Sequence, residues 1–209
     1  MSRYFVLDGP DGCGKSSQAR GLCEWLREQG RAVLHVREPG STPVGEALRR
    51  LLLSPSTGHL QPVSEALLFS AARAELVANV IAPAVQNGTV VVAERCYLST
   101  IVYQGLALSR SPGTALDSDW LLDLTRRVHG ALLPDTVFVL DVPAIVAKAR
   151  RRSRTEDRIE ARGADYHERV RQGFLQAAAA EVRCRVIDAA WPFASVQASL
   201  RAHLARRLS

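Results

Sequence analysis

Short runs of consecutive apolar residues alternate along this chain with stretches in which apolar residues recur every three or four positions. The runs predict strands at residues 4–7, 32–36, 89–93, 136–141 and 184–188. The stretches with helical spacing predict helices at residues 17–29, 43–54, 63–86 with a kink or break at Pro83, 99–106, 117–130, 144–152, 166–182 and 192–208. Strands separated by helices are typical of a parallel sheet covered on both faces. We therefore predict an α/β fold in which a five-stranded parallel sheet is flanked by helices, and one domain over residues 1–209.

A glycine-rich segment lies directly between the first predicted strand and the first predicted helix. Residues 9–16 (GPDGCGKS) fit the pattern G-x-x-x-x-G-K-[ST]. Its glycines let backbone N–H groups turn inward around a phosphate, and the helix N-terminus adds a partial positive charge. In this motif the Lys15 ammonium reaches the β- and γ-phosphates, and the Ser16 hydroxyl coordinates Mg²⁺. The correctly placed strand and helix favour this interpretation over a fortuitous glycine-rich turn.

The motif predicts a P-loop that binds a nucleoside triphosphate, which we take to be ATP, together with Mg²⁺. The predicted nucleotide-binding residues are Gly9, Pro10, Asp11, Gly12, Cys13, Gly14, Lys15, Ser16 and Ser17. In parallel sheets ligands bind beyond the carboxyl ends of the strands. This rule places Arg37-Glu38, Glu94-Arg95 and Asp141 at the same edge as the P-loop.

Composition narrows the class of protein. The chain is 47% hydrophobic and 23% charged, as in soluble globular proteins, and its apolar runs are too short for a membrane span. The first strand begins at the N-terminus and leaves no room for a signal peptide. Four cysteines without C-x-x-C spacing predict reduced thiols. We expect a cytoplasmic protein without a membrane partner.

The net charge of +6 raises the alternative of nucleic-acid binding. Arginines concentrate at residues 150–154 and in the tail at 201–207, with no aromatic residues between them, so the chain shows no sign of a platform on which bases stack. We expect no nucleic-acid partner. Phosphate handling explains residues 150–154, although a solvated charge run is the alternative there.

Five segments together point to a kinase. The chain has no N-K-x-D element of the kind found in GTPases, and phosphoryl transfer needs several positioned arginines. In order, residues 8–18 (DGPDGCGKSSQ), 37–43 (REPGSTP), 65–73 (EALLFSAAR), 94–105 (ERCYLSTIVYQG) and 157–160 (DRIE) resemble the motifs of the thymidylate kinase family. The resemblance covers most of the chain and implies the three-layer P-loop fold of nucleoside monophosphate kinases.

The resemblance also implies a reaction and an acceptor site. It implies transfer of the ATP γ-phosphoryl group to dTMP, giving dTDP for dTTP synthesis and DNA replication, in a homodimer with Mg²⁺. By resemblance Phe69 stacks on thymine, although the residues alone favour a core phenylalanine, and Asp11 accepts a hydrogen bond from the sugar 3′-hydroxyl. The predicted substrate-binding residues are Asp11, Glu38, Arg49, Phe69, Arg73, Arg95, Ser99, Thr100, Tyr103 and Gln104.

Charge neutralisation is assigned by the same resemblance. Some family members carry an arginine in the P-loop where this chain has Gly12, so we predict the type whose arginines lie in a short lid, here at about residues 150–162. The predicted catalytic residues are Lys15, Arg95, Arg152 and Arg154, and the predicted metal residues are Ser16 and Glu94. Glu94 stands where the family has aspartate, and Ser41 where it has a second glycine, which costs backbone freedom if that position needs a positive φ.

Three alternatives remain open from the sequence. One is a kinase of the same fold that acts on another pyrimidine nucleotide or on a nucleoside. Another is a nucleotide-binding regulatory protein that has lost turnover, and a third is an ATPase that binds nucleic acid.

Overall fold

The computed structural model describes residues 3–108, 116–151 and 156–208. Within them the chain forms a sheet of β1 (Tyr4–Asp8), β2 (Val33–Arg37), β3 (Val90–Glu94), β4 (Thr136–Asp141) and β5 (Cys184–Asp188). The strand order is β2-β3-β1-β4-β5, and every neighbouring pair is parallel. The predicted α/β fold with a five-stranded parallel sheet is confirmed.

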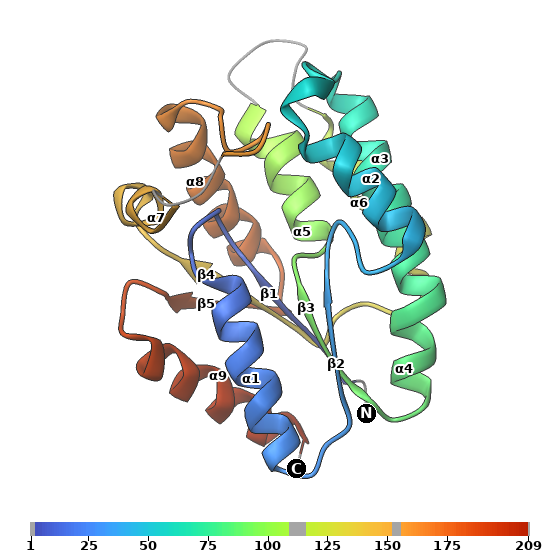
Figure 1. Cartoon of the computed structure of the whole chain (residues 1–209), viewed down its shortest axis with the longest axis vertical. Coiled ribbons are helices and arrows are strands. Elements are labelled where there is room, and N and C mark those ends of the chain that lie inside the picture. The colour runs from blue at the N-terminus through green and yellow to red at the C-terminus, as the bar shows by residue number, and fades with distance from the viewer. Residues whose placement is uncertain (1–2, 109–115, 152–155, 209) are drawn as a thin grey trace.

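Apolar side chains cover both faces of this sheet because successive residues of a strand point to opposite sides. On one face Phe5 and Leu7 pack against α1 (Lys15–Glu28) and α9 (Phe193–Leu208). On the other face Tyr4 and Val6 share a larger core with α3 (Pro62–Leu76), α5 (Tyr97–Thr100) and α8 (Ala164–Ala180). The central sheet with helices on either side gives three layers (Figure 1).

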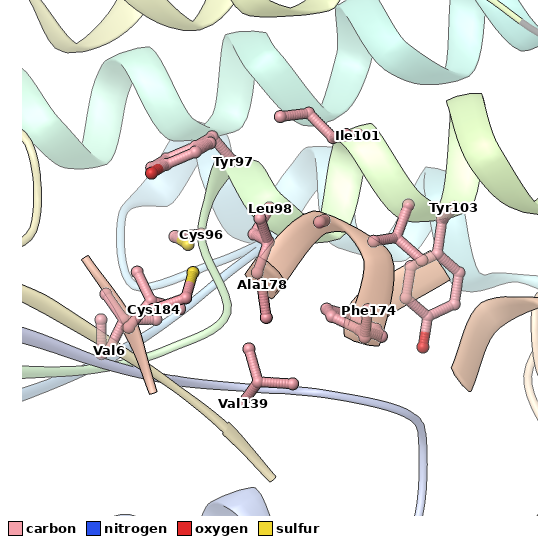
Figure 2. Close-up of a cluster of buried hydrophobic side chains, with 14 of the residues drawn as sticks. Val6, Cys96, Tyr97, Leu98, Ile101, Tyr103, Val139, Phe174, Ala178 and Cys184 are labelled. Carbon is pink, nitrogen blue, oxygen red and sulfur yellow. The ribbon is translucent and has the colours of Figure 1, made fainter. Parts of the chain in front are cut away.

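The larger core also positions a residue of the predicted site. Val6 and Val139 from the sheet, Leu98 from α5, and Phe174 and Ala178 from α8 lie together (Figure 2). The ring of Tyr103 packs edge-on against Phe174, with the centroids 5.9 Å apart, and its hydroxyl reaches the P-loop. Packing in the core therefore fixes the place of a polar group in the cleft.

The long predicted helix at residues 63–86 is interrupted, although before Pro83 and not at it. α3 ends at Leu76, a π-helical turn spans Val77–Ile81, and α4 covers Ala82–Gln86. Pro83 has no N–H to donate and its ring crowds the carbonyl of Asn79, so the preceding turn widens. Pro62–Gln86 is long and apolar enough to cross a membrane by length and composition. Its Glu65 and Arg73 are buried in ion pairs with residues of other segments, Arg158 and Glu38, so this segment is packed into the fold.

The remaining elements are α2 (Pro43–Leu53), a 3₁₀ turn at Pro55–Thr57, a π-helical turn at Ile101–Gly105, a 3₁₀ turn at Leu106–Leu108, α6 (Ser118–His129) and α7 (Ala144–Arg151). They agree with the predicted ones to within a few residues, with two exceptions. The 3₁₀ turn at Pro55–Thr57 has no predicted counterpart, and the predicted helix at residues 99–106 is divided into α5 and two further turns. α1 begins two residues before its predicted start, because Gly14 adopts a left-handed conformation (φ 97°) directly before Lys15. α8 begins and ends two residues before its predicted bounds, since Gly163 precedes its first turn.

Candidate active site

A cleft of about 950 Å³ opens beyond the carboxyl ends of the strands. The P-loop, the end of β2, α3, the end of β3 and the segment after it all contribute to its wall. Every predicted substrate-binding residue lines it: Asp11, Glu38, Arg49, Phe69, Arg73, Arg95, Ser99, Thr100, Tyr103 and Gln104. The structure thus brings together residues that stand up to 93 positions apart (104 − 11) in the sequence.

The P-loop takes its shape from glycines that no other residue could replace without strain. Gly9 and Gly12 have φ values of 134° and 85°. A Cβ on Gly9 would lie 2.6 Å from the carbonyl oxygen of Leu140, and one on Gly12 would lie 2.3 Å from that of Ala147 on α7. Because α7 packs on this turn, a larger residue at position 12 would displace α7. The Lys15 ammonium donates to the carbonyls of Gly9 (2.9 Å) and Pro10 (2.8 Å), which hold it inside the loop.

Arg95 connects the P-loop with the acceptor side of the cleft. Its guanidinium pairs with the Asp11 carboxylate and donates to the Ser99 hydroxyl (3.0 Å), and Tyr103 donates its hydroxyl to Asp11 (2.8 Å). Burial alone would raise the pKa of Asp11, but the charges of Arg95 and Lys15 outweigh it and hold that pKa well below its usual range. Arg95 has φ 71°, a strained conformation of a kind found at functional sites.

Asp8 is a residue of this site that the sequence analysis quoted only as part of a motif. It is fully buried at the end of β1. Its carboxylate accepts from the backbone N–H groups of Gly9 (2.9 Å) and Cys96 (3.2 Å) and from the Ser99 hydroxyl (2.7 Å), and it lies 3.6 Å from the Arg95 guanidinium. The sequence does contain a signal for this role, because Asp8 is a carboxylate at the end of an apolar strand and directly before the P-loop.

Arg73 and Glu38 form a buried ion pair on the acceptor side. The Nε of Arg73 donates to Glu38 Oε2 (2.6 Å), and its other nitrogens donate to the Thr100 hydroxyl (3.2 Å) and the Cys96 carbonyl (3.0 Å). Glu38 Oε1 is buried in this cleft wall without a hydrogen-bond partner. Burial raises the pKa of Glu38 to about 7, although Arg73 opposes the shift.

Phe69 lies on the wall of the cleft and is half-buried. It belongs to neither of the two core clusters of the described residues. This position argues against the alternative of a core phenylalanine, and its stacking role stays a prediction.

Gln104 contacts Glu65, a buried carboxylate that the sequence alone did not single out. It donates to Glu65 on α3 (2.7 Å), which also pairs with Arg158 (2.6 Å) and Arg162 (3.0 Å). Glu65 thereby ties the end of the predicted lid to α3.

The predicted catalytic residues Arg152 and Arg154 lie outside the described residues. Next to them Arg151, at the end of α7, lines the cleft and is 7% exposed. Its Nε and Nη1 are buried and have no hydrogen-bond partner. The sequence alone favoured Arg152 and Arg154, because a run of arginines does not show which member turns inward.

Ser16 and Glu94 lie in contact at the mouth of the P-loop. The Ser16 hydroxyl donates to Glu94 Oε2, and His35 Nε2 lies 3.0 Å from Glu94 Oε1. Burial would raise the pKa of Glu94, but the hydrogen bonds from His35 and Ser16 bring it below its usual value. The described residues hold no group of three His, Cys, Asp or Glu side chains suited to a metal. Mg²⁺ at phosphate sites commonly uses one or two protein oxygens beside waters and phosphates, and this pair of oxygen donors fits it.

Comparison with known proteins identifies the family of this chain. The family model described as thymidylate kinase matches residues 7–200. The chain belongs to the thymidylate kinase family. It is 42% identical to the thymidylate kinase of Symbiobacterium thermophilum, in an alignment that covers 96% of this chain and 92% of the relative. It is 43% identical to that of Clavibacter sepedonicus (95% and 92% covered) and 45% identical to that of a Synechococcus species (85% and 83% covered).

This thymidylate kinase family member accommodates its serine at position 41 in a specific way. Ser41 has φ 63°, so this position does need the left-handed conformation. Its hydroxyl accepts from the Arg37 N–H (2.9 Å), and its own N–H donates to the Glu46 carboxylate (2.9 Å). A glycine could also make the bond to Glu46, so the bond from Arg37 to the hydroxyl is the one that offsets the strain that glycine would avoid.

Proposed function

We propose that this protein transfers the γ-phosphoryl group of ATP to dTMP, forming ADP and dTDP, with Mg²⁺. The observation that carries the proposal is that the P-loop and the predicted acceptor residues line one cleft of about 950 Å³, with Arg95 between them. Nothing in the comparisons favours another acceptor, since the relatives aligned to this chain share the name thymidylate kinase.

The donor half consists of the loop amides and Lys15. Backbone N–H groups of the P-loop after Pro10 would receive the phosphates, because proline has no N–H and the N–H of Gly9 donates to Asp8. The Lys15 ammonium would neutralise charge near the transferred group. Ser16 and Glu94 would hold Mg²⁺, which neutralises phosphate charge when bound.

The acceptor half orients dTMP by stacking and hydrogen bonds. The Phe69 ring offers a flat apolar face to the thymine, while Arg73 and Thr100 offer donors from the adjacent wall. The free Glu38 Oε1 and the Asp11 carboxylate are acceptors for sugar hydroxyls. A base, a sugar and a phosphate would each meet a matching group.

Arg95 lies where the two substrates' phosphates would meet. A planar, permanently charged guanidinium suits a bridge between two phosphates. Arg151 adds an unpaired positive charge from α7, and Arg152 and Arg154 remain candidates in the proposed lid at about residues 150–162. Phosphoryl transfer depends mostly on positioning and charge stabilisation. The proposed mechanism therefore assigns these groups the stabilisation of phosphate charge and assigns no residue as a general base.

A coupled assay of ADP release tests the proposal. We expect ADP release in the presence of ATP, Mg²⁺ and dTMP, with lower turnover on dUMP and none on dCMP, dGMP or thymidine. Lys15→Ala should abolish it, and Phe69→Leu should raise the KM for dTMP while leaving the KM for ATP unchanged. Turnover with another acceptor would refute the substrate, and ATP binding without acceptor-dependent release would favour the regulatory alternative.

We also propose a homodimer formed through α2 and α3. These helices pack side by side (Figure 1) and expose four large apolar residues that are 44–49% accessible: Val44, Leu51, Val63 and Leu67. Covering such a face removes apolar surface from water. Light scattering should give a dimer mass for the parent chain and a monomer mass for Leu67→Glu, whereas Val182→Glu, also at an exposed apolar position, should stay dimeric. A monomeric parent would refute this proposal.

We further propose that the chain acts as one cytoplasmic domain with no nucleic-acid partner.

A further inference from the structure

His35 lies beside the carboxylate of Glu94, our proposed metal ligand, although no motif of the sequence includes this histidine. In the parallel register of β2 and β3, Arg37 pairs with Glu94 and His35 pairs with Val92. Side chains two residues apart on a strand share a face, so His35 and Glu94 stand diagonally on the face that α1 covers. The imidazole Nε2 and Glu94 Oε1 are 3.0 Å apart.

The other oxygen of the same carboxylate receives the Ser16 hydroxyl from the first turn of α1. An ionised carboxylate has no hydrogen to give, so Nε2 of His35 is the donor. Glu94 is therefore held from two sides, by a strand on one oxygen and by the P-loop helix on the other. Its side chain is 14% exposed and that of His35 27%, so solvent screens the contact only in part.

We propose that His35 is a positioning residue that holds the Glu94 carboxylate in the orientation required to bind a divalent cation carried by the nucleotide. Glutamate has one more rotatable bond than the aspartate of the family motif, and thus more orientations to lose on binding. The hydrogen bond from His35 removes that freedom before the nucleotide arrives. Partners of this kind, which orient a ligand without touching the metal, strongly influence metal affinity.

The test compares two amides that differ in reach. The side-chain nitrogen of glutamine lies near the place of histidine Nε2, whereas that of asparagine lies near the place of Nδ1 and falls short of Glu94. Titration calorimetry with the non-hydrolysable ATP analogue AMP-PNP, with MgCl₂ or with EDTA, measures binding apart from turnover. His35→Asn should weaken binding by about tenfold with Mg²⁺ and leave binding in EDTA unchanged. His35→Gln should retain the parent affinity in both.

Two further variants establish that the effect passes through Glu94. In a Glu94→Gln background, His35→Asn should cause no additional loss, because the residue through which it acts is already changed. His59→Asn, at an exposed histidine outside the cleft, should behave as the parent does. Thermal melts followed by circular dichroism check folding, and His35→Leu replaces His35→Asn if the latter does not fold.

Each remaining result would overturn the proposal. Unchanged Mg²⁺-dependent binding in His35→Asn, an equal loss in EDTA, an undiminished loss in the Glu94→Gln background, or failure of both loss variants to fold would assign His35 a merely structural role or none. The proposal rests on the proposed use of a metal–nucleotide. A parent chain that does not bind AMP-PNP would refute that function, whereas binding that is unchanged by substitution of His35 would refute only the role of His35. The acceptor does not enter this measurement.

Discussion

The buried carboxylate of Asp8 offers the sharpest test of how the site is held together. Replacing it with asparagine keeps the shape of the side chain but turns one of its two oxygens into an NH₂ donor. In the parent, Oδ1 accepts from Gly9 N–H and the Ser99 hydroxyl, and Oδ2 accepts from Cys96 N–H. Whichever way the amide is oriented, one backbone N–H then faces a donor and loses its acceptor.

The expected cost follows from these contacts. A buried donor without an acceptor costs about 1–3 kcal/mol, and Arg95, 3.6 Å away, loses a buried counter-charge as well. We expect Asp8→Asn to lower the free energy of unfolding by about 3 kcal/mol. We expect kcat to fall with it, because Asp8 also fixes Ser99, which in turn contacts Arg95.

Asp135→Asn is the matched control. Asp135 directly precedes β4, and its carboxylate accepts from the N–H of Tyr4, the first residue of β1 (2.9 Å). An amide oxygen can take over that bond. Urea unfolding should show a loss below about 1 kcal/mol for Asp135→Asn, with kcat unchanged. If Asp8→Asn loses no more stability than Asp135→Asn, the argument from unsatisfied donors is refuted.

Three further predictions concern the cleft. Ser41→Ala keeps the left-handed backbone but loses the bond to Arg37, so its free energy of unfolding in urea should be about 1 kcal/mol lower than that of the parent. Ser41→Gly loses the same bond but relieves the strain, so its stability should stay close to that of the parent. A glycine variant less stable than the alanine variant would refute this account. Because burial raises the pKa of Glu38 from 4.5 to about 7 in the folded state, folding favours its protonated form. The stability of the parent relative to Glu38→Gln should therefore fall as the pH rises from 4.5 to 7, and a flat difference in urea unfolding would contradict this pKa. Arg151→Met should lower kcat by at least about tenfold. It should not lower the melting temperature, because it removes a buried charge whose Nε and Nη1 lack partners. A lower melting temperature with normal kcat would mean that Arg151 stabilises the fold and has no part in catalysis.

The sheet was predictable because its signal is local. Each strand is a short apolar run, and each observed strand overlaps the predicted one to within a residue at either end. The P-loop was predictable for the same reason, since its glycines and Lys15 are adjacent. By contrast, the π-helical turn at Val77–Ile81 arises because Pro83 affects the turn before it. The break was therefore predicted at Pro83, a few residues C-terminal to its observed position. The partners of His35 and Glu65 come from distant segments, and no local pattern reveals them.

The motifs that identified the family turn out to be neighbours in space, and this explains why their joint presence pointed to one site. In each case an acidic residue of one motif pairs with an arginine of another: Asp8 with Arg95 (3.6 Å), Glu38 with Arg73 (2.6 Å) and Glu65 with Arg158 (2.6 Å). Buried pairs of this kind add little net stability over apolar packing, but breaking one is costly because it leaves a charge alone. A substitution in one motif therefore disturbs a second one elsewhere in the chain. The cleft can in this way hold several arginines in fixed positions before any phosphate arrives, which is the arrangement that charge stabilisation in phosphoryl transfer requires.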